Sequence, residues 1–462
     1  MRPPDAAGPR LLAAGRSIAS GAAALLRWPL RLFEGREGRE WRTVVLTLLI
    51  VFALMAALGS VGAVSTGVVV NFLVGLAITA CIFSLLALGL QVQFGHGGIL
   101  NFGLIAFAGL AAYVMGILWR HAGRGLADAI AADAALQAAV LAVVAAAAAV
   151  FAAPVAGLAV ERFRPRAPTR LKRLAVLAAA GAAAASAVSL FLPLGVTQSR
   201  DAVILLGILL GIGAAVGLAF VFAMPAIRLR EDYLAIVTLG AAELLEAFYR
   251  NEIWLTGGTE GILNLHNPIT ERALSNDAWQ GFVDALDPNL RAVPLAQLLI
   301  AFLLVLYFFL LFEALIRSPW GRVLRAIRED DTVASAMGKD VNRFRLQALV
   351  LGGIAIAVAG ILIALRTSTI FPGTYERQLT FSTWVALVVG GVANNKGVFA
   401  GAAIVLVALP ELARNLRVLE EFGLQNIVGP GQGVAAGLIL ILFMMYRPHG
   451  LVGRKEELLF GR

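Results

Sequence analysis

Few side chains in this sequence have the types and spacing that catalysis requires. The chain has four histidines and a single cysteine, Cys81, and no Ser/His/Asp, Cys/His or metal-ligand spacing is visible among them. A nucleotide-binding P-loop must end in Gly-Lys-Ser or Gly-Lys-Thr to hold phosphates, and neither 337–340 nor 394–397 fits that pattern. We therefore expect a protein that is not an enzyme and that has no cofactor and no metal site.

The most unusual chemical groups are carboxylates inside apolar segments. Glu243 and Glu246 lie three residues apart on one face of a predicted helix over 233–253, and Thr238 precedes Glu243 by five positions. An ionisable group within a membrane helix is costly, so it usually faces the protein interior and pairs, or it serves transport. Glu243 is therefore either a partner for a neighbouring helix or a contact for a transported molecule, whereas Glu246 fits a position near the outer interface.

Clusters of glycine mark two predicted helix breaks. The first contains Gly95, His96, Gly97 and Asn101, and the second comprises the glycines and asparagines of 390–397. Glycine lets two backbones approach closely, or lets a helix break so that free amides and carbonyls face a cavity. Broken helices line substrate paths in transporters, but small residues also pack helices together in membrane proteins generally. Both interpretations stay open, and the first break, with Thr238 and Glu243, is our candidate translocation pathway.

The elements that carry these groups are expected to be membrane-spanning helices. The 462 residues are 60% hydrophobic and only 15% charged, with a mean hydropathy of +0.84. A bilayer core about 30 Å thick requires roughly 20 apolar residues in helical form. We therefore predict an all-α polytopic membrane protein with about 10–12 transmembrane helices, some of them broken or re-entrant. The apolar runs lie near 43–63, 67–90, 104–119, 131–153, 174–193, 202–223, 233–253, 295–316, 346–365, 379–393, 398–412 and 428–446.

Charge in the connecting segments predicts which side of the membrane each one faces. Cytoplasmic loops are enriched in Lys and Arg. The loop 251–294 has six acidic residues against two basic ones and is expected on the outer, periplasmic side. The alanine-rich stretch 131–193 is expected to add two helices to a membrane domain over 43–453. The basic segments expected in the cytoplasm are the N-terminal arm 1–42, the loops 161–173 and 317–345, and the tail 454–462.

The segment 317–345 carries the most information about a partner. Pro319 and Gly321 mark a turn, and the short helix predicted after them is too polar to span a membrane. Its charges could orient a docked protein and its small residues could permit close approach, although composition alone favours a solvated connector. The candidate contact residues are Arg322, Arg325, Arg328, Glu329, Asp330, Ala334, Met337 and Gly338.

The residues 318–338 resemble the cytoplasmic coupling loop of the branched-chain amino acid permease family, in its larger subunit type. Further similar blocks are 229–240 with Glu243, the outward turn that contains Thr256, Gly257 and Gly258, and the closing 446–453. The segment 93–103 is a looser match, because its histidine is displaced relative to the glycines of the family pattern.

The resemblance implies a permease subunit of an ATP-binding cassette importer in the bacterial inner membrane, with both termini in the cytoplasm. Its partners would be a second related permease, two ATP-binding subunits that hydrolyse ATP, and a periplasmic substrate-binding protein. The expected substrates are branched-chain amino acids, and urea or short amides are the alternative within the family. An ion-coupled secondary transporter, in which Glu243 would carry protons, is the alternative outside it.

Overall fold

The computed structural model describes residues 35–60, 66–132, 199–228 and 231–415, and single residues or short pieces between 434 and 452. Most of the predicted N-terminal arm, almost all of the alanine-rich stretch, the loop 161–173 and the predicted tail therefore lie outside the described residues. So do the spans predicted at 131–153 and 174–193, except for their first residues 131–132, whereas 428–446 is described only in part.

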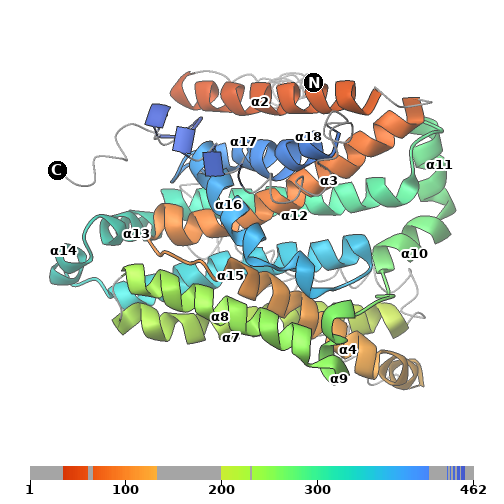
Figure 1. Ribbon diagram of the computed structural model, residues 1–462, viewed down its shortest axis with the longest axis horizontal. Helices are drawn as coiled ribbons and strands as arrows, with labels where there is room; N and C mark the ends of the chain where they lie inside the picture. Colours follow the sequence, from red (N-terminus) through yellow and green to blue (C-terminus); the bar gives the residue numbers. More distant parts are fainter. Residues whose placement is uncertain are drawn as a thin grey trace, which may run out of the picture.

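Within the described residues the chain is helical, and the only strand-like pairing is one isolated antiparallel bridge between Ile262 and Ile370. The predicted all-α fold is thereby confirmed (Figure 1). The elements are α2 (Gly35–Ser60), α3 (Thr66–Leu90), the π-helix η1 (Gln91–His96), α4 (Leu104–Ala132), α7 (Ser199–Arg228), α8 (Glu231–Asn251), α9 (Ile253–Thr256), η2 (Gly258–Glu260), α10 (Pro268–Ser275), α11 (Asp277–Leu286), α12 (Ala292–Arg317), α13 (Pro319–Glu329), α14 (Asp331–Ala336), α15 (Val341–Thr367), η3 (Pro372–Thr374), α16 (Arg377–Gly390), α17 (Gly397–Gly401), the π-helix η4 (Ala402–Ala408) and α18 (Leu409–Asn415).

Six helices of the described chain are long and apolar enough to cross a membrane. They correspond to the predicted spans at 43–63, 67–90, 104–119, 202–223, 295–316 and 346–365. The predicted span at 233–253 is α8, a 21-residue helix that carries several charged side chains. The predicted spans at 379–393 and 398–412 form a short helical pair, in which the 14-residue α16 packs against α17 and η4.

Helix α15 lies at the centre of the bundle, because 83% of its most apolar window is buried and it packs against α3, α4 and α7. The close approach to α3 depends on two glycines. A Cβ atom on Gly352 would lie 2.5 Å from the carbonyl oxygen of Gly89, and a Cβ on Gly89 would lie 2.6 Å from that of Gly352. Small residues at such a crossing let two membrane helices meet backbone to backbone.

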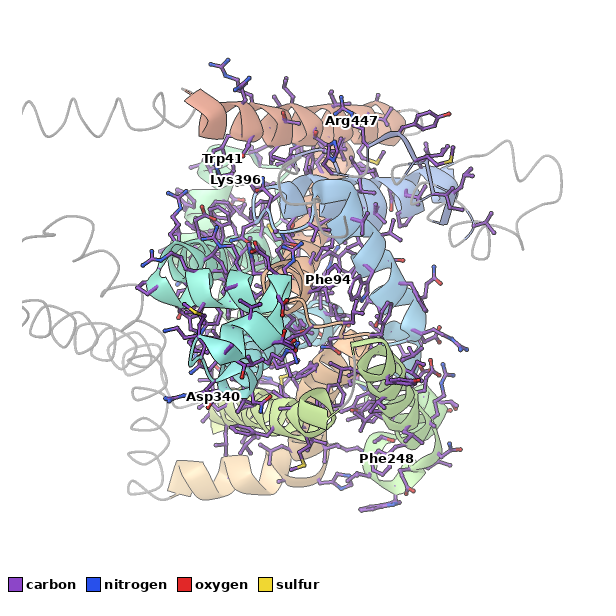
Figure 2. All side chains as sticks on the ribbon, turned by 90° about the vertical axis from the view of Figure 1, so that its left-hand side faces the viewer. Trp41, Phe94, Phe248, Asp340, Lys396 and Arg447 are labelled. Atoms are coloured by element: carbon purple, nitrogen blue, oxygen red, sulfur yellow. The ribbon has the colours of Figure 1, made fainter. Side chains whose placement is uncertain are left out.

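The helix α2 is attached to the second predicted break by a buried ion pair. Lys396 Nζ lies 3.0 Å from a carboxylate oxygen of Glu40 and 5.9 Å from the centre of the Trp41 ring. Figure 2 shows Trp41 and Lys396 side by side at the end of the molecule that carries α13 and α14. A buried charge requires such a partner, since leaving it alone in an apolar interior is very unfavourable.

The two predicted loops lie at opposite ends of the bundle. Helices α13 and α14, from the loop 317–345, lie at the left of Figure 1, whereas α9, α10 and α11, from the loop 251–294, lie at the right. At the second end Asp201 accepts hydrogen bonds from the Arg272 guanidinium (2.7 and 2.9 Å) and lies 2.6 Å from His266, so α7 and α10 are joined by buried polar contacts.

Candidate functional site

The two predicted helix breaks are real and pack against each other. Helix α3 ends in the π-turn η1, the chain leaves helical geometry at 97–103, and α16 and α17 are separated by the turn 391–396. The Gln91 side-chain amide finds hydrogen-bond partners when its oxygen faces the opposing turn. In that orientation the oxygen accepts a hydrogen bond from Ala393 N (2.8 Å). A Cβ atom on Gly95 would lie 3.1 Å from that same nitrogen. The first break therefore needs glycine in part for close contact with the second.

A chain of polar contacts joins both breaks to the end of α12. His96 Nε2 lies 2.9 Å from Asn395 Oδ1, and Asn395 Nδ2 donates to Glu313 at 3.2 Å. Glu313 is paired with Arg317 at 2.7 Å, at the point where α12 leads into α13. Because the asparagine oxygen only accepts, we assign the Nε2 proton to His96.

Asn101 and Thr238 satisfy the backbone of the first break. Asn101 is fully buried, donates to Gln93 Oε1 (2.8 Å) and accepts from Gly103 N (2.8 Å). Thr238 from α8 accepts from Phe102 N at 3.1 Å. Buried backbone amides outside a helix require partners of this kind. Both residues therefore position the break. Gly97 is tightly packed in the same segment, because a Cβ atom on it would lie 2.6 Å from Gln93 O.

The predicted coupling segment forms two short helices. Ser318 begins α13 by accepting a hydrogen bond from Trp320 N (3.2 Å), with a proline at the first helical position. One face of α13, with Gly321, Leu324 and Ile327, is buried against the rest of the chain. The opposite face, with Arg322 and Glu329, is exposed.

Asp330 separates the two helices and begins α14. It accepts from the Thr332 hydroxyl and from the backbone N–H groups of Val333 (3.0 Å) and Thr332 (2.9 Å). These bonds hold the pKa of Asp330 below its ordinary value of 3.8, with the Thr332 hydroxyl as the largest cause. Ala334 is buried, whereas Met337 is 76% exposed at the tip.

Gly338 ends this segment with a φ of +75°, which L side chains rarely adopt. No other atom lies within 4 Å of the position that its Cβ would take. Among the described residues nothing packs on Gly338, so its backbone conformation, and not close packing, accounts for the glycine there. The outward-facing candidates of the segment are Arg322, Arg325, Glu329, Asp330 and Met337.

Arg328 differs from its neighbours because it turns inward. Its guanidinium donates to the carbonyl oxygen of Gly95, and its side chain lies 3.1 Å from the Cβ position of Gly98. The sequence suggested a contact with a partner, but the structure places this arginine on the first break. The coupling segment and the break are therefore in direct contact.

Glu243 lies apart from the break and faces the beginning of α16. Its Oε1 is 3.7 Å from Arg377 Nε, too far for a hydrogen bond, and no described residue donates to this buried oxygen. Glu246 instead pairs with Arg250 at 2.9 Å. The residues predicted to line the pathway therefore lie in two places. Most of them are buried at the first break, whereas Glu243 lies beside Arg377.

Four aromatic rings pack together where α16 meets the first break, and we did not single them out from the sequence. Phe102 stacks on Trp384 with ring centres 4.6 Å apart, and Phe94 and Phe381 pack beside them at 4.5 and 5.9 Å. Figure 2 shows Phe94 at the centre of the view, beside α16. The spacing 377, 381 and 384, which places three large side chains on one helical face, was the available signal.

The outward turn at 256–258 holds the far end of the bundle together. Thr256 Oγ1 lies 2.7 Å from the carbonyl oxygen of Tyr249 and 2.8 Å from that of Glu252, so its single hydroxyl proton is shared between these two acceptors. Gly257 has a φ of +85° and its Cβ would lie 2.0 Å from Gly261 O, so only glycine fits. Gly258 has a φ of +63° in the same turn. These residues act structurally in the described chain.

Comparison with known proteins gives consistent matches. The profile of a family described as "Branched-chain amino acid transport system / permease component" matches residues 172–445, more than half of the chain. The chain is 30% identical over 261 residues to a probable branched-chain amino acid transport permease protein LivM of Methanocaldococcus jannaschii. The matched region covers 55% of this chain and 68% of that protein.

Two bacterial relatives are named high-affinity branched-chain amino acid transport system permease protein LivM. The proteins of Salmonella typhimurium and Escherichia coli are each 30% identical, over 250 and 247 residues, and the match spans 55% of their lengths. No solved structure matches the chain. The chain belongs to the family of branched-chain amino acid transport permease components.

Proposed function

We propose that this protein is a permease subunit of an ATP-binding cassette importer that carries branched-chain amino acids into the cell. The observation that supports this proposal best is the contact between Arg328, at the end of the predicted coupling helix α13, and Gly95 in the first break. An importer driven by a partner's ATP hydrolysis needs such a connection between its docking surface and its membrane helices. The names of its relatives point to branched-chain amino acids.

The two ends of the bundle suggest where the proposed partners would bind. The exposed face of α13 and α14, with Arg322, Arg325, Glu329 and Met337, would dock on one of two ATP-binding subunits. The opposite end, with α9, α10 and α11, would receive the substrate-binding protein. A second, related permease would complete the path, since the chain also resembles relatives named LivH (25% identical over 193 residues in Methanocaldococcus jannaschii).

This assignment implies an orientation. The α13 end would face the cytoplasm, with both termini on that side, and the membrane would be the inner membrane of a bacterium. Two alternatives remain as outcomes of a test. A urea or amide permease would share the whole arrangement, and an ion-coupled transporter would need no ATP-binding partner.

The test is reconstitution of the complete complex in proteoliposomes. The full chain, the second permease and the ATP-binding subunits should take up L-leucine only when ATP and the loaded binding protein are supplied. The chain purified alone should neither bind nor hydrolyse ATP. Uptake by the chain without ATP-binding subunits, abolished when the proton gradient collapses, would contradict the proposal. Uptake of urea in preference to leucine would change the assigned substrate but leave the assignment as an ATP-driven importer unchanged.

A further inference from the structure

Helix α16 presents a continuous chemical stripe. Arg377, Phe381 and Trp384 are at positions i, i+4 and i+7, which places them one above another on a single face. Phe102 from the first break stacks on Trp384 and lies 5.9 Å from Phe381. Phe94, next to Gly95, extends the stripe at 4.5 Å from Trp384. A charged group at one end is thus followed by apolar rings that lead to the first break.

Two charged groups stand together at the polar end of the stripe. Glu243 and Arg377 are 38% and 68% exposed in their side chains, and their nearest atoms are 3.7 Å apart. A nearby pair provides a contrast, because Arg250 makes close bonds of 2.9 Å to Glu246 and 2.7 Å to Glu376. Arg250 therefore has two carboxylate partners at hydrogen-bond distance, whereas the Glu243–Arg377 contact is loose and leaves hydrogen-bonding capacity unused.

This loose pair lies below the outer end of the bundle. Tyr375, two residues before Arg377, is buried and donates to Gly360 O at 2.8 Å. Glu243 itself lies eight residues before the end of α8 at Asn251, so its backbone is about 12 Å below that end. Charged side chains at such a depth do not face lipid but line a water-filled path or meet a polar partner.

We propose that Glu243, Arg377 and the aromatic stripe form a transit site for a zwitterionic amino acid with an apolar side chain. The guanidinium of Arg377 matches the substrate carboxylate, and the Glu243 carboxylate matches the ammonium group on the same carbon. Phe381, Phe102 and Trp384 offer apolar surface to the aliphatic side chain. Urea and simple amides have no such opposite charges, so this chemistry favours amino acids. The inference rests on the proposed function.

The experiment uses the complete reconstituted complex with radiolabelled L-leucine. Arg377→Gln and Glu243→Gln should each lower ATP-driven leucine uptake at least tenfold, whereas ATP hydrolysis stimulated by the binding protein should stay within about twofold of the parent. Glu246→Gln, a matched change one turn away on α8, should leave uptake near normal. Phe381→Ala, which removes only apolar surface, should lower leucine uptake more than uptake of the smaller L-alanine.

The outcomes separate the site from the function on which it rests. Normal leucine uptake by both charge variants would overturn the site and leave the importer assignment intact. Loss of the second permease from the purified variant complexes would assign Glu243 and Arg377 to a subunit interface and overturn the site as well. If the parent complex shows no ATP-driven uptake, the proposed function itself fails.

Discussion

The guanidinium of Arg328 and the carbonyl oxygen of Gly95 are joined by a hydrogen bond across 233 positions of sequence. Gly95 belongs to the π-turn η1, and the adjacent His96 is bonded through Asn395 to Glu313. Arg328 lies in the last turn of α13, and Glu313 lies six residues before α13 begins. The coupling segment is therefore attached to the first break near both of its ends. A displacement of α13 would be transmitted to the break through these two contacts.

The first prediction concerns the bond of Arg328. Arg328→Ala should separate ATP hydrolysis from transport, because the docking face is retained while its contact with the break is lost. In proteoliposomes we expect ATP hydrolysis to continue and leucine uptake per ATP to fall at least fivefold. Arg322→Ala, at an exposed position of α13, is the matched control and should weaken retention of the ATP-binding subunits in a salt-sensitive way. Equal effects of both substitutions on subunit retention would contradict the distinction.

The second prediction compares two glycines in helices. A Cβ on Gly321 would lie 2.2 Å from Ile316 O, whereas nothing lies within 4 Å of the Cβ position of Gly240. Gly321→Ala should destabilise the packing of α13 by about 1–3 kcal/mol through overpacking. Gly240→Ala should stabilise α8 by about 0.5–1 kcal/mol, since alanine loses less backbone entropy. Thermal unfolding in detergent should move in opposite directions for the two variants, and a lower melting temperature for both would refute this account.

The third prediction concerns the cap at Asp330. Its pKa is below 3.8 in the folded chain, so the contribution of the ionised group is complete above that ordinary value. It is lost only as the pH falls through the lowered pKa, well outside the physiological range. Asp330→Asn keeps a good capping oxygen and should preserve stimulated ATP hydrolysis at neutral pH, whereas Asp330→Ala should lower it several-fold. Equal activity of the two variants would show that the cap does not matter for coupling.

The fourth prediction concerns orientation. In a background in which Cys81 is replaced by serine, a cysteine at Arg325 should react with a membrane-impermeant thiol reagent only from the cytoplasmic side. A cysteine at Ser275 should react only from the outside, because both positions are exposed at opposite ends of the bundle. Intact cells and inside-out vesicles provide the two arms. Labelling at Arg325 in intact cells would reverse the orientation and remove the docking surface from the cytoplasm.

The fold could be anticipated from the sequence because hydrophobic length is a strong signal in membrane proteins. The predicted short pair at 379–393 and 398–412 is found as α16 and α17–α18. The predicted span at 104–119 is instead part of a 29-residue helix, and the break lies just before it. Such a break cannot be located from hydropathy, because the sequence is apolar both before and after it.

The site was anticipated in its parts but not in its connections. Glu243 was recognisable as a costly charge, yet its nearest basic residue, Arg377, is 134 positions later and no local pattern links the two. Arg328 was read as an outward contact because helical spacing does not fix which face of a short polar helix is buried. Leu324 and Ile327 decide that face, and they are buried because α13 packs against α12, α15 and η1, which are distant in sequence or lie outside the helix itself.

The ion pair between Glu40 and Lys396 has a consequence for biogenesis. Glu40 enters the membrane with the first described helix, whereas Lys396 is synthesised 356 residues later. At the usual rate of translation, about 5–20 residues per second, Lys396 is synthesised tens of seconds after Glu40. The ion pair can therefore form only after the chain has been synthesised as far as Lys396. A chain that ends before Lys396 cannot form this pair, so its helix α2 would lack the buried attachment to the turn 391–396.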